Sequence, residues 1–179
     1  MAHISLPDGL PGITGPLTSY PETAKHLRGL AEALMRGPSS LTPAERELIA
    51  TYVSAQNDCN FCMNSHAAIA RCLYGNDRDL VDQAISDFQQ AELSEKMKAL
   101  LVIAGKVQQG GRRVTHEDVA SARAAGADDK AIHDTVLTAA AFCMFNRYVD
   151  GLDTWTPDEP VMYEQAGALM AEKGYLKIS

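Results

Sequence analysis

The sequence has few basic residues and no long apolar run, and both shortages exclude classes of protein. Its 16 lysines and arginines are outnumbered by 23 aspartates and glutamates, which leaves a net charge of −7. This balance argues against a nucleic-acid partner or an anionic membrane, since both require a clustered positive surface. No stretch approaches the roughly 20 apolar residues of a membrane span, and residues 1–15 do not resemble a secretory signal. We therefore expect a cytoplasmic protein.

Cysteines are also few. Four in 179 residues are too few for the disulfide framework of a secreted protein, and a reducing compartment keeps them as thiols unless one pair is catalytic. The apolar fraction of 46% is enough to bury a core without help from metals or disulfides. The spacing of the cysteines therefore matters more than their number.

Strand patterns are lacking too, because no segment alternates strictly between apolar and polar residues. Residues 1–21 hold four of the eight prolines and three glycines, which predicts an extended arm over residues 1–20, lying on the body or on a neighbouring subunit. Residues 21–179 are expected to form a single all-α domain, a helical bundle. Helices are expected at about 22–35, 42–55, 59–73, 78–87, 93–108, 115–125, 128–147 and 158–172.

Two helix starts are marked by capping residues. Thr42, Pro43 and Glu45 have the spacing of a capping box with proline in the first helical position. Before the next helix, Asn57 or Asp58 is positioned to cap the N-terminus. The two helices are joined by a short turn, so they are expected to form a helical hairpin.

The second helix of this hairpin carries a CxxC motif followed by a histidine. Cys59, Cys62 and His66 are spaced i, i+3 and i+7, which places them on one helical face. Both cysteines would lie in the first turn, where unpaired N–H groups and the helix dipole favour a thiolate over a thiol. The motif therefore predicts a cysteine that is nucleophilic at neutral pH.

Glu47, on the first helix of the hairpin, is predicted to meet His66. Measured along its helix, Glu47 lies roughly 15 Å before the turn. Measured along the next helix, His66 lies roughly 12 Å after the turn. In an antiparallel hairpin the two residues are therefore level. A carboxylate beside an imidazole fixes its tautomer and raises its basicity, so the pair could accept the proton of Cys62 directly or through one water.

Other interpretations of these residues exist. The two cysteines and His66 could bind zinc, with Cys72 or Glu47 as a fourth ligand, although structural zinc sites usually have a second pair of ligands. Cysteines are often core residues, and we expect this of Cys72 and Cys143. The remaining histidines have no comparable neighbours and are expected at the surface or at helix caps: His3, His26, His116 and His133.

A glutamate twelve residues before a CxxC, with a histidine four residues after it, resembles the core of the AhpD-like alkylhydroperoxidases in the carboxymuconolactone decarboxylase superfamily. The resemblance also covers residues 41–47, and residues 141–147 are similar to the peroxidase-related branch of that family. One feature differs, since well-known members carry a histidine between the cysteines, where this sequence has Asn60 and Phe61. This difference affects proton delivery or the choice of substrate.

The resemblance implies an all-α AhpD-like fold that assembles as a trimer or hexamer. It implies that Cys62 attacks a hydroperoxide to give a sulfenic acid, that Cys59 resolves it to a disulfide, and that Glu47 and His66 move the protons. It also implies reduction by a dithiol, in the best-known members a lipoylated protein, without a bound cofactor.

Two other functions remain open. The wider superfamily includes decarboxylase or lactone-processing activities, in which His66 would be the acid or base, although such members generally lack the CxxC. Alternatively, the protein is a thiol-disulfide partner or redox sensor whose oxidation changes binding without useful turnover.

Overall fold

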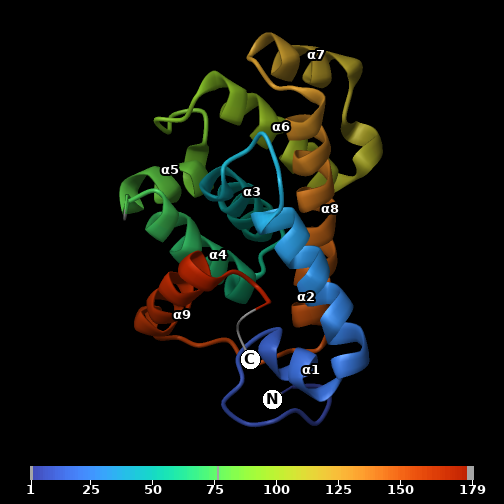
Figure 1. Ribbon diagram of the computed structural model, residues 1–179, viewed down its shortest axis with the longest axis vertical. Coiled ribbons are helices and arrows are strands. Elements are labelled where there is room, and N and C mark those ends of the chain that lie inside the picture. The colour runs from blue at the N-terminus through green and yellow to red at the C-terminus, as the bar shows by residue number, and fades with distance from the viewer. Residues whose placement is uncertain (1, 76, 177–179) are drawn as a thin grey trace.

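The computed structural model describes residues 2–75 and 77–176, and this part of the chain is helical, without a strand (Figure 1). The predicted all-α class is confirmed. The helices are α1 (Thr14–Ser19), α2 (Pro21–Arg36), α3 (Pro43–Gln56), α4 (Asn60–Leu73), α5 (Arg78–Asp87), α6 (Glu95–Gln109), α7 (His116–Ala124), α8 (Asp129–Gly151) and α9 (Pro160–Lys173), with a 3₁₀ turn at Gly111–Arg113.

Helices α3 and α4 form the predicted hairpin. Of the two predicted N-caps, the one of α3 is present and the one of α4 is not. Thr42 and Glu45 make both hydrogen bonds of the capping box. At the start of α4 the N-cap is Cys59, so the prediction of an Asn57 or Asp58 cap is wrong. The side chain of Asn57 instead donates to Oδ1 of Asn146 on α8 at 2.8 Å. A tertiary hydrogen bond thus replaces the local cap.

The N-terminal segment also differs from its prediction. Residues 1–20 were expected to be extended, but they contain the short helix α1. Pro16 lies in the first turn of α1, where its missing N–H removes no helical hydrogen bond. The rest of the segment lies on its own chain, since the N–H of Gly12 donates to the carbonyl of Trp155 at 2.8 Å. Next to Gly12, Ile13 packs against the cluster that contains both cysteines of the CxxC motif.

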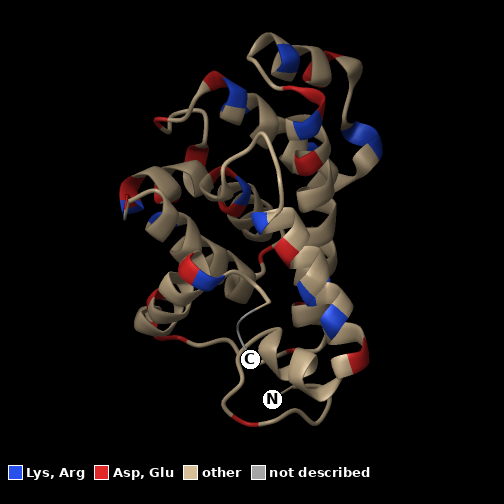
Figure 2. Ribbon diagram, in the orientation of Figure 1, with Lys and Arg blue, Asp and Glu red and all other residues tan. Residues whose placement is uncertain are grey.

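The core joins the hairpin to α6 and α8, which lie beside it (Figure 1). Its fully buried side chains include Leu48, Val53, Ile69 and Leu100. Among the described residues, lysines and arginines are interspersed with aspartates and glutamates along the helices (Figure 2). Within the described ranges, no helix is both long and apolar enough to span a bilayer.

Helix α9 packs closely against α4 because Gly167 lies on Ala68. A Cβ on Gly167 would come within 2.7 Å of the Cβ of Ala68 and 2.9 Å of its carbonyl carbon. Both contacts involve groups that cannot rotate away. The glycine therefore sets the distance between α4 and α9.

Gly167→Ala is expected to lower the free energy of unfolding by about 1–3 kcal/mol, because the two helices must separate. The measurement is urea denaturation, with Gly29→Ala as the matched control. Gly29 lies inside α2, and a Cβ there meets nothing within 4 Å. Alanine should therefore stabilise that helix by roughly 0.5–1 kcal/mol. Equal effects of the two substitutions would contradict the packing described here.

Candidate active site

The hairpin brings Glu47 and His66 into direct contact. Nδ1 of His66 lies 2.7 Å from Oε2 of Glu47, as the antiparallel geometry predicts. The Glu47 side chain is fully buried, and that of His66 is 12% exposed. The imidazole ring also lies edge-on against Phe142 of α8, with ring centroids 4.5 Å apart. Both side chains are therefore held in one orientation.

The second oxygen of Glu47 is held by two further donors. Nη1 of Arg36, at the end of α2, donates to Oε1 at 2.7 Å, and the hydroxyl of Tyr175 donates to the same atom at 2.7 Å. Burial alone would raise the pKa of Glu47. The hydrogen bond and charge of His66, the charge of Arg36 and the hydrogen bond from Tyr175 outweigh it, so that the pKa is lowered. Glu47 is therefore an ionised, acceptor-only group.

This arrangement sets the tautomer of His66. Because an ionised carboxylate can only accept, Nδ1 of His66 must be the donor in their hydrogen bond. The neutral imidazole then carries its lone pair on Nε2, which is the nitrogen available as a base. Glu47 thus orients His66 and does not itself accept a proton from the cysteine.

The two cysteines lie at the start of α4 and are free thiols. Cys59 is fully buried, and Cys62 is 4% exposed. They pack together with Val149 near the end of α8, and Ile13 and Phe61 cover them. The two sulfur atoms of the motif therefore share one small apolar cluster.

Cys59 does not have the lowered pKa that the sequence predicted. A hydrogen bond between its side chain and that of Cys62 is the largest cause of a raised pKa, followed by burial and by the charge of Cys62. A hydrogen bond to the carboxylate of Asp150 acts in the same direction. These effects exceed the lowering effect of the backbone hydrogen bond from Cys62 at the helix N-terminus, so the pKa of Cys59 is raised.

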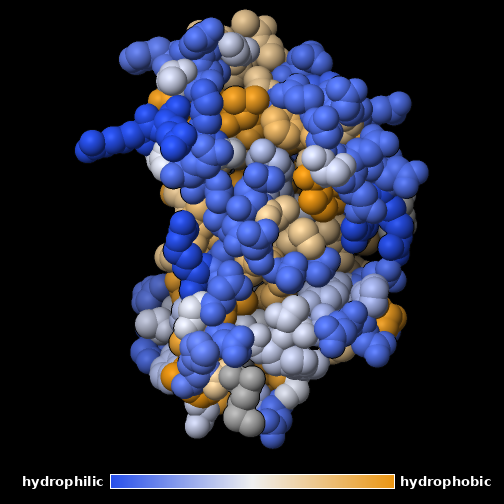
Figure 3. Space-filling model, turned by 180° about the vertical axis from the view of Figure 1, so that it is seen from behind, coloured by the Kyte–Doolittle hydropathy of each residue, from blue (hydrophilic) through white to orange (hydrophobic). Residues whose placement is uncertain are grey.

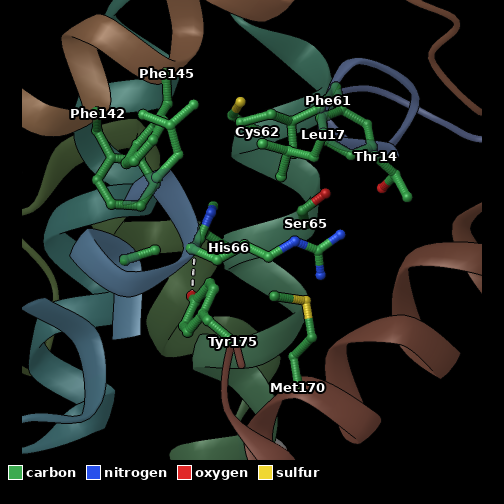
Figure 4. Close-up of a pocket in the computed structure, with 14 residues that line it drawn as sticks. Thr14, Leu17, Phe61, Cys62, Ser65, His66, Phe142, Phe145, Met170 and Tyr175 are labelled. Atoms are coloured by element: carbon green, nitrogen blue, oxygen red, sulfur yellow. Dashed lines mark hydrogen bonds between the residues drawn. The ribbon is translucent and has the colours of Figure 1, made fainter. Parts of the chain in front are cut away.

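A cavity of about 180 Å³ opens onto Cys62 and His66 (Figure 4). Its walls come from α1, α2, α4, α8, α9 and the segment after α9. They are mainly apolar, with Leu17, Phe145 and Met170 on different sides. Cys59 is not among the described residues that line it. A molecule in the cavity therefore meets Cys62 first, beside the imidazole of His66.

The remaining predicted residues lie elsewhere. Cys143 is buried, as expected, whereas Cys72 is partly exposed and is not a core residue. His3, His26, His116 and His133 are all exposed, as predicted. Within the described residues, no group of three or more histidine, cysteine, aspartate or glutamate side chains converges to hold a metal ion. The zinc interpretation therefore lacks a ligand set.

Two residues that contact Glu47, Arg36 and Tyr175, could not be identified from the sequence. They lie 11 and 128 residues from Glu47 along the chain, and neither belongs to a recognisable motif. The apolar cavity was also not predicted, because six separate segments form it. No local pattern in the sequence signals these contacts.

The chain is similar to known proteins in sequence and in fold. The model of the carboxymuconolactone decarboxylase family matches residues 21–86, which include the whole α3–α4 hairpin. No protein of curated function matches the sequence.

Three solved structures have a similar fold. An uncharacterized peroxidase-related protein from a Silicibacter species has a TM-score of 0.78 and 26% identity over 91% of this chain and 94% of that chain. An uncharacterized peroxidase-related protein from Ralstonia eutropha, described as an alkylhydroperoxidase AhpD core, has the same TM-score and identity over 88% and 81%. A protein of unknown function from Agrobacterium tumefaciens, for which an AhpD role in antioxidant defence has been suggested, is similar in fold alone, with a TM-score of 0.68 and 20% identity over 80% and 97%.

Proposed function

We propose that this chain is an AhpD-like member of the carboxymuconolactone decarboxylase superfamily and that it acts as a thiol-dependent hydroperoxide reductase. The observation that carries the proposal is the position of Cys62. It lies in an apolar cavity beside His66, whose tautomer Glu47 sets, and it packs against the protonated thiol of Cys59. A nucleophile, a base and a resolving thiol are thus within one site.

In the first step, Nε2 of His66 accepts the proton of Cys62, directly or through one water. The thiolate attacks one oxygen of the hydroperoxide, the O–O bond breaks, and Cys62 becomes a sulfenic acid. The alkoxide that leaves takes the proton back from His66 and departs as an alcohol. The sulfur is oxidised by two electrons, and the peroxide is reduced by two.

In the second step, Cys59 attacks the sulfenic acid of Cys62. The S–S bond forms, the S–O bond breaks, and the hydroxyl leaves as water. The proton that completes this water comes from Cys59, by way of the hydrogen-bonded carboxylate of Asp150, which is exposed and in exchange with solvent. An external dithiol, such as a lipoylated protein, then reduces the disulfide and restores both thiols.

The assembly belongs to the proposal as well. Apolar side chains on α8 and α9 are exposed, among them Met144, Val161 and Leu169, and so is Trp155 between these helices. Seen from behind, the hydrophilic surface is interrupted by apolar patches (Figure 3). Such patches mark subunit contacts, and we propose a trimer or hexamer. A monomer in light scattering would contradict this.

The lining of the cavity predicts a preference for organic hydroperoxides. Burying an aromatic ring there is favourable by roughly 1.5–3 kcal/mol, so kcat/KM for cumene hydroperoxide should exceed that for hydrogen peroxide by about tenfold or more. Leu17→Gln places a polar group in the wall and should lower the rate with cumene hydroperoxide alone. An equal loss with both peroxides would mean that the cavity does not bind the substrate.

Cys59→Ser tests the second step. Without the resolving thiol, Cys62 should stop at the sulfenic acid after one equivalent of peroxide, and dimedone should label it in nearly every chain. Mass spectrometry of the labelled peptide measures this, and Cys72→Ser is the control that should form the disulfide normally. A Cys59→Ser protein that turns over at the normal rate would remove Cys59 from the cycle.

A further inference from the structure

We propose that Tyr175 is a positioning residue of this active site, supplied by a C-terminal strap that comprises residues 174–176. Its hydroxyl fixes the carboxylate of Glu47 and the ring of His66 in the geometry that the base requires. The contacts stand by themselves, whereas their catalytic consequence rests on the function proposed above.

Tyr175 contacts both members of the pair at once. Its hydroxyl donates to Oε1 of Glu47 at 2.7 Å. It also lies 3.3 Å from Nδ1 of His66, the contact that is dashed in Figure 4. Because the hydroxyl proton is directed at Glu47, the oxygen presents a lone pair to Nδ1 of His66. The phenol ring is nearly parallel to the imidazole, with an angle of 13° between the planes and centroids 6.2 Å apart. Tyr175 thus stabilises the Nδ1–H tautomer from a second side.

The strap is held in one register by α2. The N–H of Tyr175 donates to Oε2 of Glu32 at 2.6 Å, and the guanidinium of Arg36 lies over the phenol ring, 5.2 Å from its centroid. Gly174 turns the chain with φ +72°, and a Cβ there would come within 2.7 Å of the Glu32 carboxylate. Only a residue without a side chain fits this turn without displacing Glu32. The strap is therefore docked at both its backbone and its ring.

Removing the hydroxyl has a defined electrostatic consequence. The groups that act on Glu47 are His66 from α4, Arg36 from α2, Tyr175 from the strap and Arg46 on its own helix. The hydrogen bond from Tyr175 lowers the pKa of Glu47, and burial opposes it. Without that bond the pKa of Glu47 rises. Protonation of Glu47, which removes the acceptor for His66, then begins at a higher pH.

The test is Tyr175→Phe, which keeps the ring over Arg36 and removes the hydroxyl alone. The primary readout is the rate at which iodoacetamide alkylates Cys62 as a function of pH, followed on the Cys62 peptide in the full chain. We expect the part of the profile in which the alkylation rate rises with pH to move to higher pH. The alkylation rate near neutral pH should fall about tenfold, which corresponds to the loss of one hydrogen bond to a charged group. Tyr20→Phe, at an exposed position, should leave the profile unchanged.

A second variant covers the case in which Tyr175→Phe fails to fold. Glu32→Ala removes the clamp on the N–H of Tyr175 without touching Glu47, and it should shift the profile in the same direction by a smaller amount. An unshifted profile in folded Tyr175→Phe, or in Glu32→Ala if the first variant does not fold, overturns the role of Tyr175. A shifted alkylation profile in a protein that does not reduce peroxides would support Tyr175 and contradict the proposed function instead.

Discussion

Cys62→Ser is expected to abolish hydroperoxide reduction, with consumption falling to the rate measured without protein. A serine hydroxyl beside His66 is not ionised at neutral pH and does not form an oxidised intermediate of the sulfenic type. The cavity and the Glu47–His66 pair should stay intact, because the change replaces one small buried atom. The measurement is steady-state consumption of cumene hydroperoxide with an excess of dithiol.

The matched control for Cys62 is Cys143→Ser. Cys143 is also buried, on α8, and its sulfur lies 3.6 Å from Nδ2 of Asn57. The hydroxyl can keep that contact, so the activity should be unchanged. Full activity in Cys62→Ser would show that the chemistry does not pass through this thiol.

Glu47→Gln is expected to slow the first step by about a hundredfold, at the lower end of what general acid-base groups contribute. Glutamine has nearly the same shape, but it is neutral and its amide group carries donors. It therefore cannot accept from His66, Arg36 and Tyr175 together as the carboxylate does. The measurement is rapid mixing of reduced protein with peroxide, followed by acid quenching and detection of oxidised Cys62.

Glu45→Gln, on the same helix, is the control for Glu47→Gln. Glutamine can replace glutamate in a capping box, so α3 should be preserved and the first step should keep its rate. A rate loss of the same size in both variants would point to a disturbed helix instead of a lost catalytic carboxylate. An unchanged rate in Glu47→Gln would mean that His66 needs no anionic partner.

The hairpin and its contact between Glu47 and His66 could be predicted because both follow from local rules. The capping box fixes where α3 begins, the short turn makes α4 antiparallel, and the rise per residue places the two side chains level. No further information is needed to bring these residues together.

Features that depend on distant segments could not be predicted in this way. Asn57 leaves the cap because Asn146 offers a hydrogen bond across the fold. The raised pKa of Cys59 reflects its contact with Cys62, its burial and its contact with Asp150, which outweigh the helix terminus that the sequence suggests. Tyr175 reaches Glu47 only because α9 packs on α4 and Glu32 holds the strap. Each of these outcomes is decided by tertiary packing.

The most direct test of the proposed function is a count of thiols in the fully reduced protein before and after one equivalent of an organic hydroperoxide, with peptide mapping. We expect two of the four thiols to disappear and Cys59 and Cys62 to be found joined in a disulfide. Four remaining thiols, or oxidation at Cys72 or Cys143 with Cys59 and Cys62 still reduced, would contradict it.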